Sequence, residues 1–124
     1  MLIAALVLAS LASLLHVYIW YLESFAWTGA ARKVFGTSEQ EAQATRELAF
    51  NQGFYNLFLA LMGGVGIVCV ATGHGLVGRT LIWAGVGSML AAAALLFVTS
   101  PNKRGAAIRQ GTLPLLALAL LAIA

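Results

Sequence analysis

The chain is short, strongly apolar and almost free of charge: it has 124 residues, of which 61% are hydrophobic and 9% are charged, and its mean hydropathy is +0.93. Soluble domains have roughly 45 to 50% apolar and 25% charged residues, so this composition excludes a soluble globule and indicates an integral membrane protein. The net charge of +3 does not indicate nucleic-acid binding, because the basic residues lie in short connections between apolar segments, where an anionic lipid surface is their expected partner.

Four apolar segments are long enough to cross a bilayer as helices. Crossing a hydrocarbon core of about 30 Å takes roughly 20 helical residues. No strand-like alternation is present, and helices satisfy every backbone polar group within one segment. We therefore predict an all-α bundle, a single transmembrane domain over residues 1–124, with helices at about 2–27, 38–71, 77–99 and 101–124.

The expected helix ends carry local signals. The first segment has no basic residues before it, exceeds the apolar length of a signal peptide and contains Glu23, so we interpret it as a helix of the mature protein. Ser38 followed by Glu41 forms a capping box, which predicts that the second helix begins in the first connection, before the hydrocarbon. Ser100 and Pro101 are typical of a cap and a first turn, and they predict the start of the fourth helix.

The basic residues predict the orientation of the bundle. The second connection offers only Arg79, whereas all the other basic residues lie in or beside the first and third connections. These are Arg32, Lys33, Arg46, Lys103, Arg104 and Arg109. By the positive-inside rule the first and third connections are cytoplasmic and both termini lie outside. We expect a multi-pass protein of the bacterial inner (plasma) membrane.

Polar side chains interrupt three of the four segments at one level. In the first segment His16, Trp20, Glu23 and Trp27 fall on a stripe about 60° wide when each residue turns the helix by about 100°. Trp27 is at the height of an interfacial belt residue, whereas Trp20 lies too deep for that role.

The second segment begins with "NQGFYN", which places Asn51, Gln52, Tyr55 and Asn56 in the first turns below the predicted cytoplasmic surface, and the fourth segment adds Gln110. The opposite half of each helix is nearly all Leu, Ala, Val and Gly. The pattern predicts a polar cavity that is reached from the cytoplasmic side and closed on the outer side.

Two interpretations of these residues are open. Amide side chains can simply hydrogen-bond helices to one another, Glu23 can form an ion pair with Arg46 or Arg109, and His16 can be a neutral imidazole bonded to an amide. Ionisable residues within spans are costly, however, and by default mark functional sites. On the functional interpretation the catalytic residues are His16, Glu23, Asn51 and Asn56, and the substrate-binding residues are Trp20, Gln52, Tyr55 and Gln110.

Three stretches, "HVYIWYLESFAW", "NQGFYNLFLALMG" and "RQGTLPLLALALL", resemble the small four-helix bacterial membrane proteins described as domain of unknown function 1304. The resemblance covers nearly the whole chain and implies the four-helix topology. It also implies that polar motif positions of the family are occupied here by His16, Glu23, Asn51, Gln52, Asn56 and Gln110.

The first functional hypothesis is an acid–base isomerase. A carboxyl and an imidazole in different environments can serve as acid and base, and Glu23 and His16 would lie on either side of a lipophilic small molecule. The Trp20 ring offers a π face to a developing cation, while the amides hold a carbonyl, epoxide or hydroxyl oxygen. The reaction class is a proton shift or an epoxide or ring opening.

The alternative hypothesis is a proton-coupled transporter of small hydrophobic cations, in which protons and substrate compete for Glu23 and two copies form the pathway. A purely structural or partner-binding role is the third reading. We expect no metal, since the second histidine, His74, lies in the outward connection, and no cofactor, with haem on His16 as an alternative. "GGVGIV" lies within a span and is not a nucleotide loop. The expected partners are the bilayer and a lipophilic small molecule, with no nucleic acid, and a homo-oligomer is compatible with the small-residue face of the third helix.

Overall fold

The computed structural model describes all 124 residues as helices joined by short connections, with no strand. The long helices are α1 (Leu2–Phe25), α4 (Arg46–Ala71), α5 (Gly75–Thr99) and α6 (Arg104–Ile123). Two short helices, α2 (Ala31–Phe35) and α3 (Glu39–Ala44), lie in the first connection, and a 3-10 turn, η1 (Pro101–Lys103), precedes α6. Four helices are long and apolar enough to cross a membrane, so the predicted all-α bundle is confirmed and the chain is a multi-pass membrane protein.

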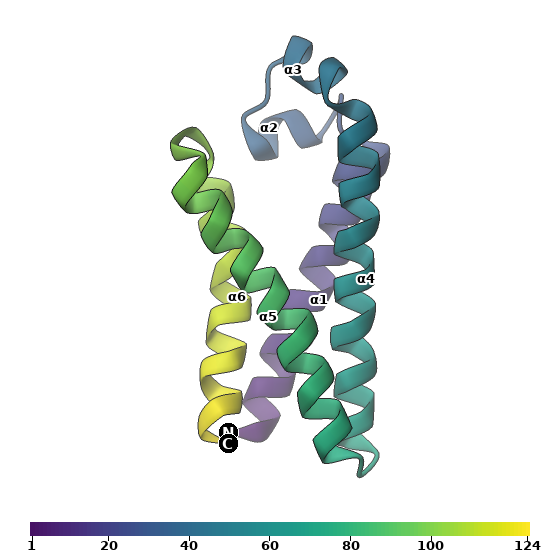
Figure 1. Ribbon diagram of the computed structural model, residues 1–124, viewed down its shortest axis with the longest axis vertical. Helices are drawn as coiled ribbons and strands as arrows, with labels where there is room; N and C mark the ends of the chain where they lie inside the picture. Colours follow the sequence, from purple (N-terminus) through teal and green to yellow (C-terminus); the bar gives the residue numbers. More distant parts are fainter.

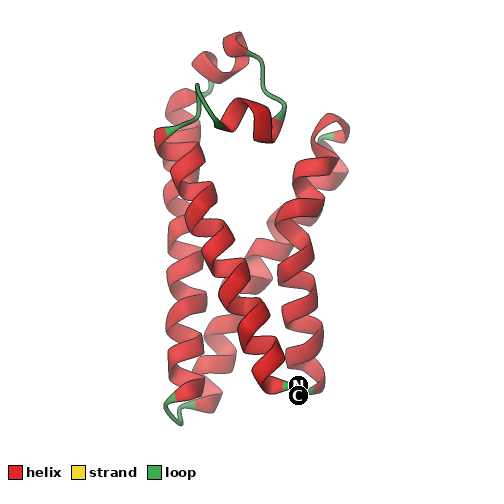
Figure 2. Cartoon of the chain, turned by 180° about the vertical axis from the view of Figure 1, so that it is seen from behind, coloured by secondary structure: helices red, strands yellow, loops and turns green.

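The four long helices form two pairs, α1 with α4 and α5 with α6. The pairs meet at one end of the molecule and separate at the other (Figure 1). α1 packs against α4 and α6, and α5 packs against the same two helices. Both termini lie at the closed end, α2 lies between the separated ends of the pairs, and α3 lies above α2, as the view from behind also shows (Figure 2). That the terminal end faces outward stays a prediction from the positions of the basic residues.

Glycines close the terminal half of the bundle, because they let the backbones of α4 and α5 touch. A Cβ atom added to Gly66 would lie 2.8 Å from the carbonyl oxygen of Gly78, and one added to Gly78 would lie 2.6 Å from that of Gly66. A Cβ on Gly85 would lie 3.0 Å from both the Gly63 nitrogen and the Leu59 oxygen. Contacts through small residues are the usual way in which helices associate within lipid.

At two depths of the α1–α4 contact, a serine of α1 packs against a glycine of α4. The hydroxyl of Ser13 lies 2.7 Å from where a Cβ of Gly63 would be, and the hydroxyl of Ser24 similarly fills the space beside Gly53. Ser24 Oγ also donates a 2.9 Å hydrogen bond to the carbonyl oxygen of Phe50. These contacts fix the rotation and the axial register of α4 against α1.

The first connection differs from the prediction of one helix over 38–71. Ser38 does cap a helix, since its Oγ accepts a 3.1 Å hydrogen bond from the Glu41 nitrogen, but that helix is the short α3. Thr45, at φ −107° and ψ 8°, separates α3 from α4. Its hydroxyl donates to the Glu41 oxygen at 2.7 Å and accepts from Trp27 Nε1 at 3.0 Å. The long-range bond to Trp27 holds the break in place, and no local signal could have predicted it.

The helix α2 was not predicted at all, because its five residues are too few to show a periodic pattern. It ends at Gly36, which has a φ of +67°, a left-handed conformation that glycine adopts without strain. Ala31 and Phe35, one turn apart, pack against apolar side chains of α1 and α6. The remaining predicted ends are close to the observed ones: the first helix ends at Phe25 rather than residue 27, and the third begins at Gly75 rather than residue 77.

Candidate functional site

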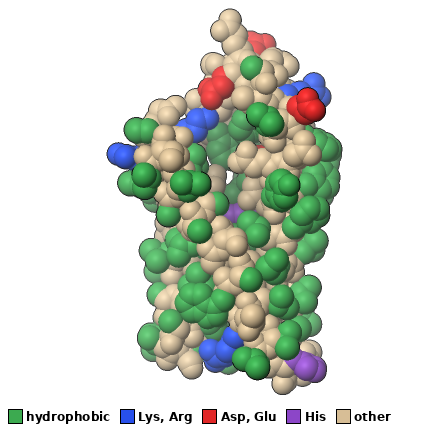
Figure 3. All heavy atoms as spheres, in the orientation of Figure 1, with side chains coloured by type: hydrophobic (Ala, Val, Ile, Leu, Met, Phe, Trp, Pro, Cys, Tyr) green, Lys and Arg blue, Asp and Glu red, His purple; other side chains and the backbone are tan.

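A cavity of about 420 Å³ lies in the half of the bundle where the helix pairs separate, beneath α2 and α3. Figure 3 shows it as a hollow between the two columns of side chains. Every helical element contributes to its wall. The lining residues are Glu23, Trp27, Phe35, Glu41, Thr45, Leu48, Ala49, Gln52, Asn56, Ala92, Leu96, Ser100, Lys103 and Gln110.

Glu23 is the one carboxyl that the transmembrane helices bring into the cavity wall. It lies in the last turn of α1 and is only 4% exposed. The amide Nδ2 of Asn56 donates a hydrogen bond to Glu23 Oε1 across the α1–α4 contact. The same Nδ2 lies 3.3 Å from the Gln52 carbonyl oxygen, which places the amide group between its own helix and the carboxyl. Asn56 therefore orients Glu23, and Gln52 belongs to the same wall.

An ion pair between Glu23 and Arg46 or Arg109, one of the two interpretations of the sequence, does not form. The only salt bridge in the structure joins Lys103 to Glu41, and Arg109 Nη2 instead donates a 2.8 Å hydrogen bond to the Val34 carbonyl oxygen. The partner of the buried carboxyl is thus an uncharged amide. A carboxyl without a fixed counter-cation can exchange a proton with a bound molecule without breaking an ion pair.

The two sides of the cavity differ in polarity. α1 and α4 contribute Glu23, Gln52 and Asn56, whereas α5 contributes Ala92 and Leu96. Gln110 of α6 adds a third amide, as the sequence predicted. The cavity can therefore hold a molecule that is polar on one side and apolar on the other.

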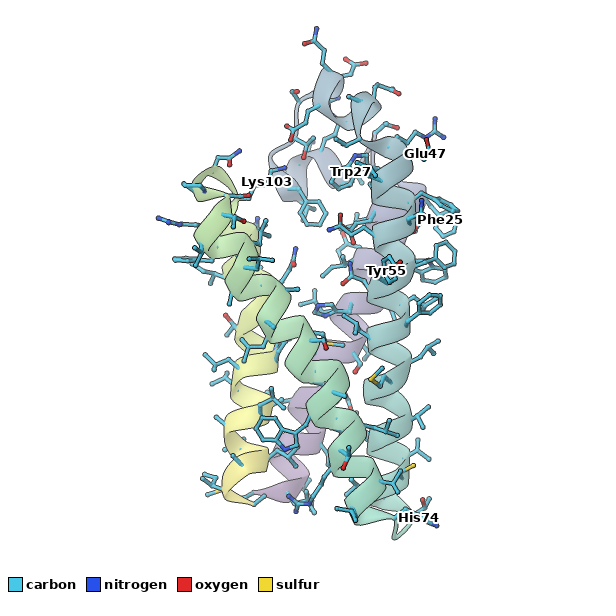
Figure 4. All side chains as sticks on the ribbon, viewed as in Figure 1. Phe25, Trp27, Glu47, Tyr55, His74 and Lys103 are labelled. Carbon is cyan, nitrogen blue, oxygen red and sulfur yellow. The ribbon has the colours of Figure 1, made fainter.

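His16 shares the face of α1 that carries Glu23, but it lies below the cavity and does not line it. The ring is 2% exposed, and its Nδ1 lies 2.9 Å from the Ala12 carbonyl oxygen of its own helix. It stands one turn above Ser13, which faces the Gly63 level where α4 meets α5. The other histidine, His74, lies far from this level, in the loop near the terminal end (Figure 4).

The stretch "NQGFYN" divides between two faces of α4. Gln52 and Asn56 reach the cavity, whereas Tyr55 is 69% exposed and Asn51 donates a 3.0 Å hydrogen bond back to the Glu47 carbonyl oxygen. At about 100° per residue, Tyr55 is turned by about 100° and Asn51 by about 140° from Asn56. The structure therefore does not bring Asn51 or Tyr55 to the predicted site.

Trp20 also lies away from the cavity, in a cluster of aromatic rings on the outer side of α1 and α4. Its ring stands edge-on to Phe25 and Phe54, with centroids 5.5 Å and 5.7 Å away, and Figure 4 shows Phe25 directed outward. Edge-to-face packing of this kind stabilises aromatic pairs. The predicted role of Trp20 as a ring facing substrate is not supported by this placement.

Sequence reasoning missed the roof of the cavity. Lys103 Nζ lies 3.3 Å from Glu41 Oε1, which joins η1 to α3 above the hollow, and Phe35 of α2 completes the cover. Trp27, predicted as an interfacial belt residue, instead lines the cavity and donates to Thr45. Residues 41 and 103 lie in different connections, and no spacing rule links them.

No group of three or more His, Cys, Asp or Glu side chains lies close enough to hold a metal ion. What the arrangement offers chemically is one buried carboxyl, three amides and an apolar wall. Such a set can move a proton and can hydrogen-bond an oxygen atom.

Comparison with known proteins places the chain in a family without assigning it an activity. A family model described as "Protein of unknown function (DUF1304)" matches residues 10–122, a range that includes all the polar residues of the cavity. No curated protein matches the chain, and no solved structure matches it. Because the family model covers nearly the whole sequence, the chain belongs to the family of proteins of unknown function DUF1304.

Proposed function

We propose that this protein is a membrane-embedded isomerase that moves a proton within a small lipophilic carbonyl compound, with Glu23 as the proton carrier. The observation that supports the proposal is a lone buried carboxyl, bonded to an amide and facing a cavity of about 420 Å³. A cavity of this size falls in the range of roughly 300 to 1,000 Å³ typical of small-molecule sites.

The reaction that fits one carboxyl is the migration of a double bond into conjugation with a carbonyl group. The Glu23 carboxylate removes a proton from the carbon between the carbonyl and the double bond, and the C–H electron pair moves to make a dienolate with its negative charge on oxygen. The electron pair then returns from oxygen, and the far carbon of the former double bond takes the proton from Glu23. No atom is gained or lost, and nothing is oxidised or reduced.

The amide side chains stabilise the negatively charged dienolate oxygen. Gln52 and Gln110 line the cavity, and an amide N–H that donates to the dienolate oxygen stabilises the charge that develops there. Such donors act more strongly in a dry site than in water. Asn56 has a different task, since its Nδ2 already holds Glu23.

In this proposal Glu23 carries out both proton transfers, whereas the sequence had led us to expect Glu23 and His16 as an acid–base pair. The imidazole lies beneath the cavity floor and bonds to its own backbone, whereas the carboxyl lies in the wall. The ring of His16 supports the floor of the site in this scheme and takes no part in proton transfer.

Proton-coupled transport by two copies of the chain is the alternative, and the closed half of the bundle weighs against a pathway through either chain alone. A molecule that crossed a single chain would have to separate α4 from α5 where Gly66 and Gly78 touch. The small, tightly packed residues Ala5, Ala9 and Ala12 of α1 leave no polar route through that half.

The test uses the purified protein in detergent and β,γ-cyclohexenone in deuterated water, with NMR following migration of the double bond and uptake of deuterium. We expect Glu23→Gln to lower the rate above the uncatalysed background by about 10²- to 10⁴-fold, the usual contribution of a positioned acid–base group. Glu47→Gln is the matched control, because Glu47 is exposed and outside the cavity, and it should keep the full rate.

Equal rates in wild type and Glu23→Gln would overturn the assignment of Glu23. A wild-type protein that converts none of a panel of unsaturated ketones in detergent, yet takes up a hydrophobic cation into vesicles when a proton gradient is imposed, would establish transport instead.

A further inference from the structure

The cavity has one side that no helix covers, the side between α4 and α5. These helices touch from their connecting loop up to the level of Gly85, which meets Leu59 and Gly63. Beyond that level they separate (Figure 1), and their inward residues line opposite walls of the cavity, Gln52 and Asn56 on α4 and Ala92 and Leu96 on α5. The glycine contact therefore marks the lower end of a lateral opening between α4 and α5, which we call the window.

The side between α1 and α6 is narrowed by the helix α2, since Ala31 and Phe35 pack with Ile19, Leu22 and Ala106. A separate cavity of about 130 Å³ lies on that side, and Phe35 and Gln110 line both cavities and stand between them.

The roof is held to the α5–α6 pair by two polar contacts. Lys103 pairs with Glu41 at 3.3 Å, and Arg109 Nη2 donates to the Val34 carbonyl oxygen at 2.8 Å. A molecule that came from the aqueous side would have to break these contacts, whereas one that came from the bilayer would meet none of them.

The window is apolar at its edges and polar at its back. Leu48 on α4 and Leu95 on α5 are 70% and 64% exposed, while Glu23 lies deep in the wall with 4% exposure. A molecule with a polar end and a hydrocarbon tail matches this gradient, because its tail stays against apolar surface while its polar end exchanges lipid for amide partners.

We infer that the substrate is a single-chain amphiphile that enters sideways from the bilayer through the window between α4 and α5. Its polar end reaches Glu23 and its tail remains in the window and the surrounding lipid, since a cavity of about 420 Å³ is at the small end of ligand sites and does not enclose a long chain. The carbonyl nature of that polar end rests on the proposed function, whereas the entrance route does not.

Photolabelling in nanodiscs of phosphatidylcholine tests the route without any turnover. One probe is hexadecanol with a diazirine beside the hydroxyl group, and a second carries the diazirine in the middle of the chain. Mass spectrometry of the irradiated protein should place the first label on the α4 residues around Gln52 and Asn56. It should place the second label on the residues at the edges of the window, Leu48 and Leu95.

Two variants on adjacent residues of α5 sharpen the result. Both Ala91 and Ala92 are exposed, but only Ala92 lines the cavity. Ala92→Phe should abolish labelling near Gln52 by the first probe, and Ala91→Phe should leave it at the wild-type level. If Ala92→Phe does not yield folded protein, Leu96→Trp at the same wall serves in its place, with folding checked by circular dichroism.

Labelling that is spread evenly over the lipid-facing surface, or that is equal in the Ala92→Phe and Ala91→Phe proteins, would overturn the inference. So would labelling that rises when the roof is loosened by Glu41→Gln and that a short, water-soluble diazirine alcohol reproduces, because entry would then be from water. Failure of the isomerase proposal alone would look different: Glu23→Gln and wild type would show no turnover difference while window labelling persisted in both.

Discussion

Two glycines of α4, Gly64 and Gly66, should respond differently to substitution by alanine. A Cβ added at Gly66 would lie 2.8 Å from the Gly78 carbonyl oxygen and 2.9 Å from the Ile82 nitrogen. A Cβ added at Gly64 has no atom within 4 Å. The first position is the α4–α5 contact itself, and the second faces away from it.

The distances give the size of the effect. Carbon contacts are comfortable at roughly 3.5 Å, so Gly66→Ala must move backbone atoms apart by roughly 0.7 Å, and no flexible side chain can absorb that shift. Overpacking of this kind costs about 1 to 3 kcal/mol, while the gain in helix propensity is about 1 kcal/mol at most. We expect Gly66→Ala to lower the free energy of unfolding by up to about 2 kcal/mol, and Gly64→Ala to leave it unchanged or raise it by up to about 1 kcal/mol.

The measurement is unfolding of the purified variants in mixed micelles with increasing dodecyl sulfate, followed by circular dichroism. Gly78→Ala faces the same contact, since its Cβ would lie 2.6 Å from the Gly66 oxygen, and it should be destabilising as well. The double variant Gly66→Ala with Gly78→Ala should lose less than the sum of the two, because one separation of the helices relieves both clashes. Equal stability of Gly66→Ala and Gly64→Ala would refute the direct backbone contact between α4 and α5.

Two further predictions concern the cavity. Asn56→Leu removes the amide that bonds Glu23. It should lower the free energy of unfolding by about 1 to 3 kcal/mol, the usual result of leaving a buried acceptor unpaired. The control Asn51→Leu removes an amide that bonds only to its own helix, and it should change the free energy of unfolding by less than about 0.5 kcal/mol in the same titration. The Glu41–Lys103 pair should show a coupling of only about 0.2 to 1 kcal/mol in a double-mutant cycle with Glu41→Gln and Lys103→Met, because the Glu41 side chain is 48% exposed. A coupling energy well above that range would contradict the argument from exposure and would mean that the ion pair holds the roof strongly.

The pattern of apolar and polar residues was enough to predict the class of the protein and the depth of the site in the membrane. Four apolar segments dictated four spanning helices, since a bilayer admits few other structures. The spacing of His16 and Glu23 placed both on one face of α1. The polar residues at one depth of three helices indicated a site there, and Glu23, Gln52, Asn56 and Gln110 do line one cavity.

Which of the polar residues share that cavity depends on how the helices pack against one another. A helical period gives the angles between residues of one helix, but not the direction in which the helix faces its neighbours. That direction is set here by contacts between helices, with Ser13 and Ser24 fitting against Gly63 and Gly53, and it sends Asn56 inward and Tyr55 outward.

The depth of the cavity and its roof also depend on packing between elements, which local sequence patterns do not give. α4 and α5 touch up to the level of Gly85 and separate beyond it (Figure 1), which leaves Glu23 in the wall and His16 beneath the floor. Glu41 and Lys103 meet although 62 residues separate them. Local patterns fix the elements, whereas packing between elements fixes their rotation and spacing, and the site depends on both.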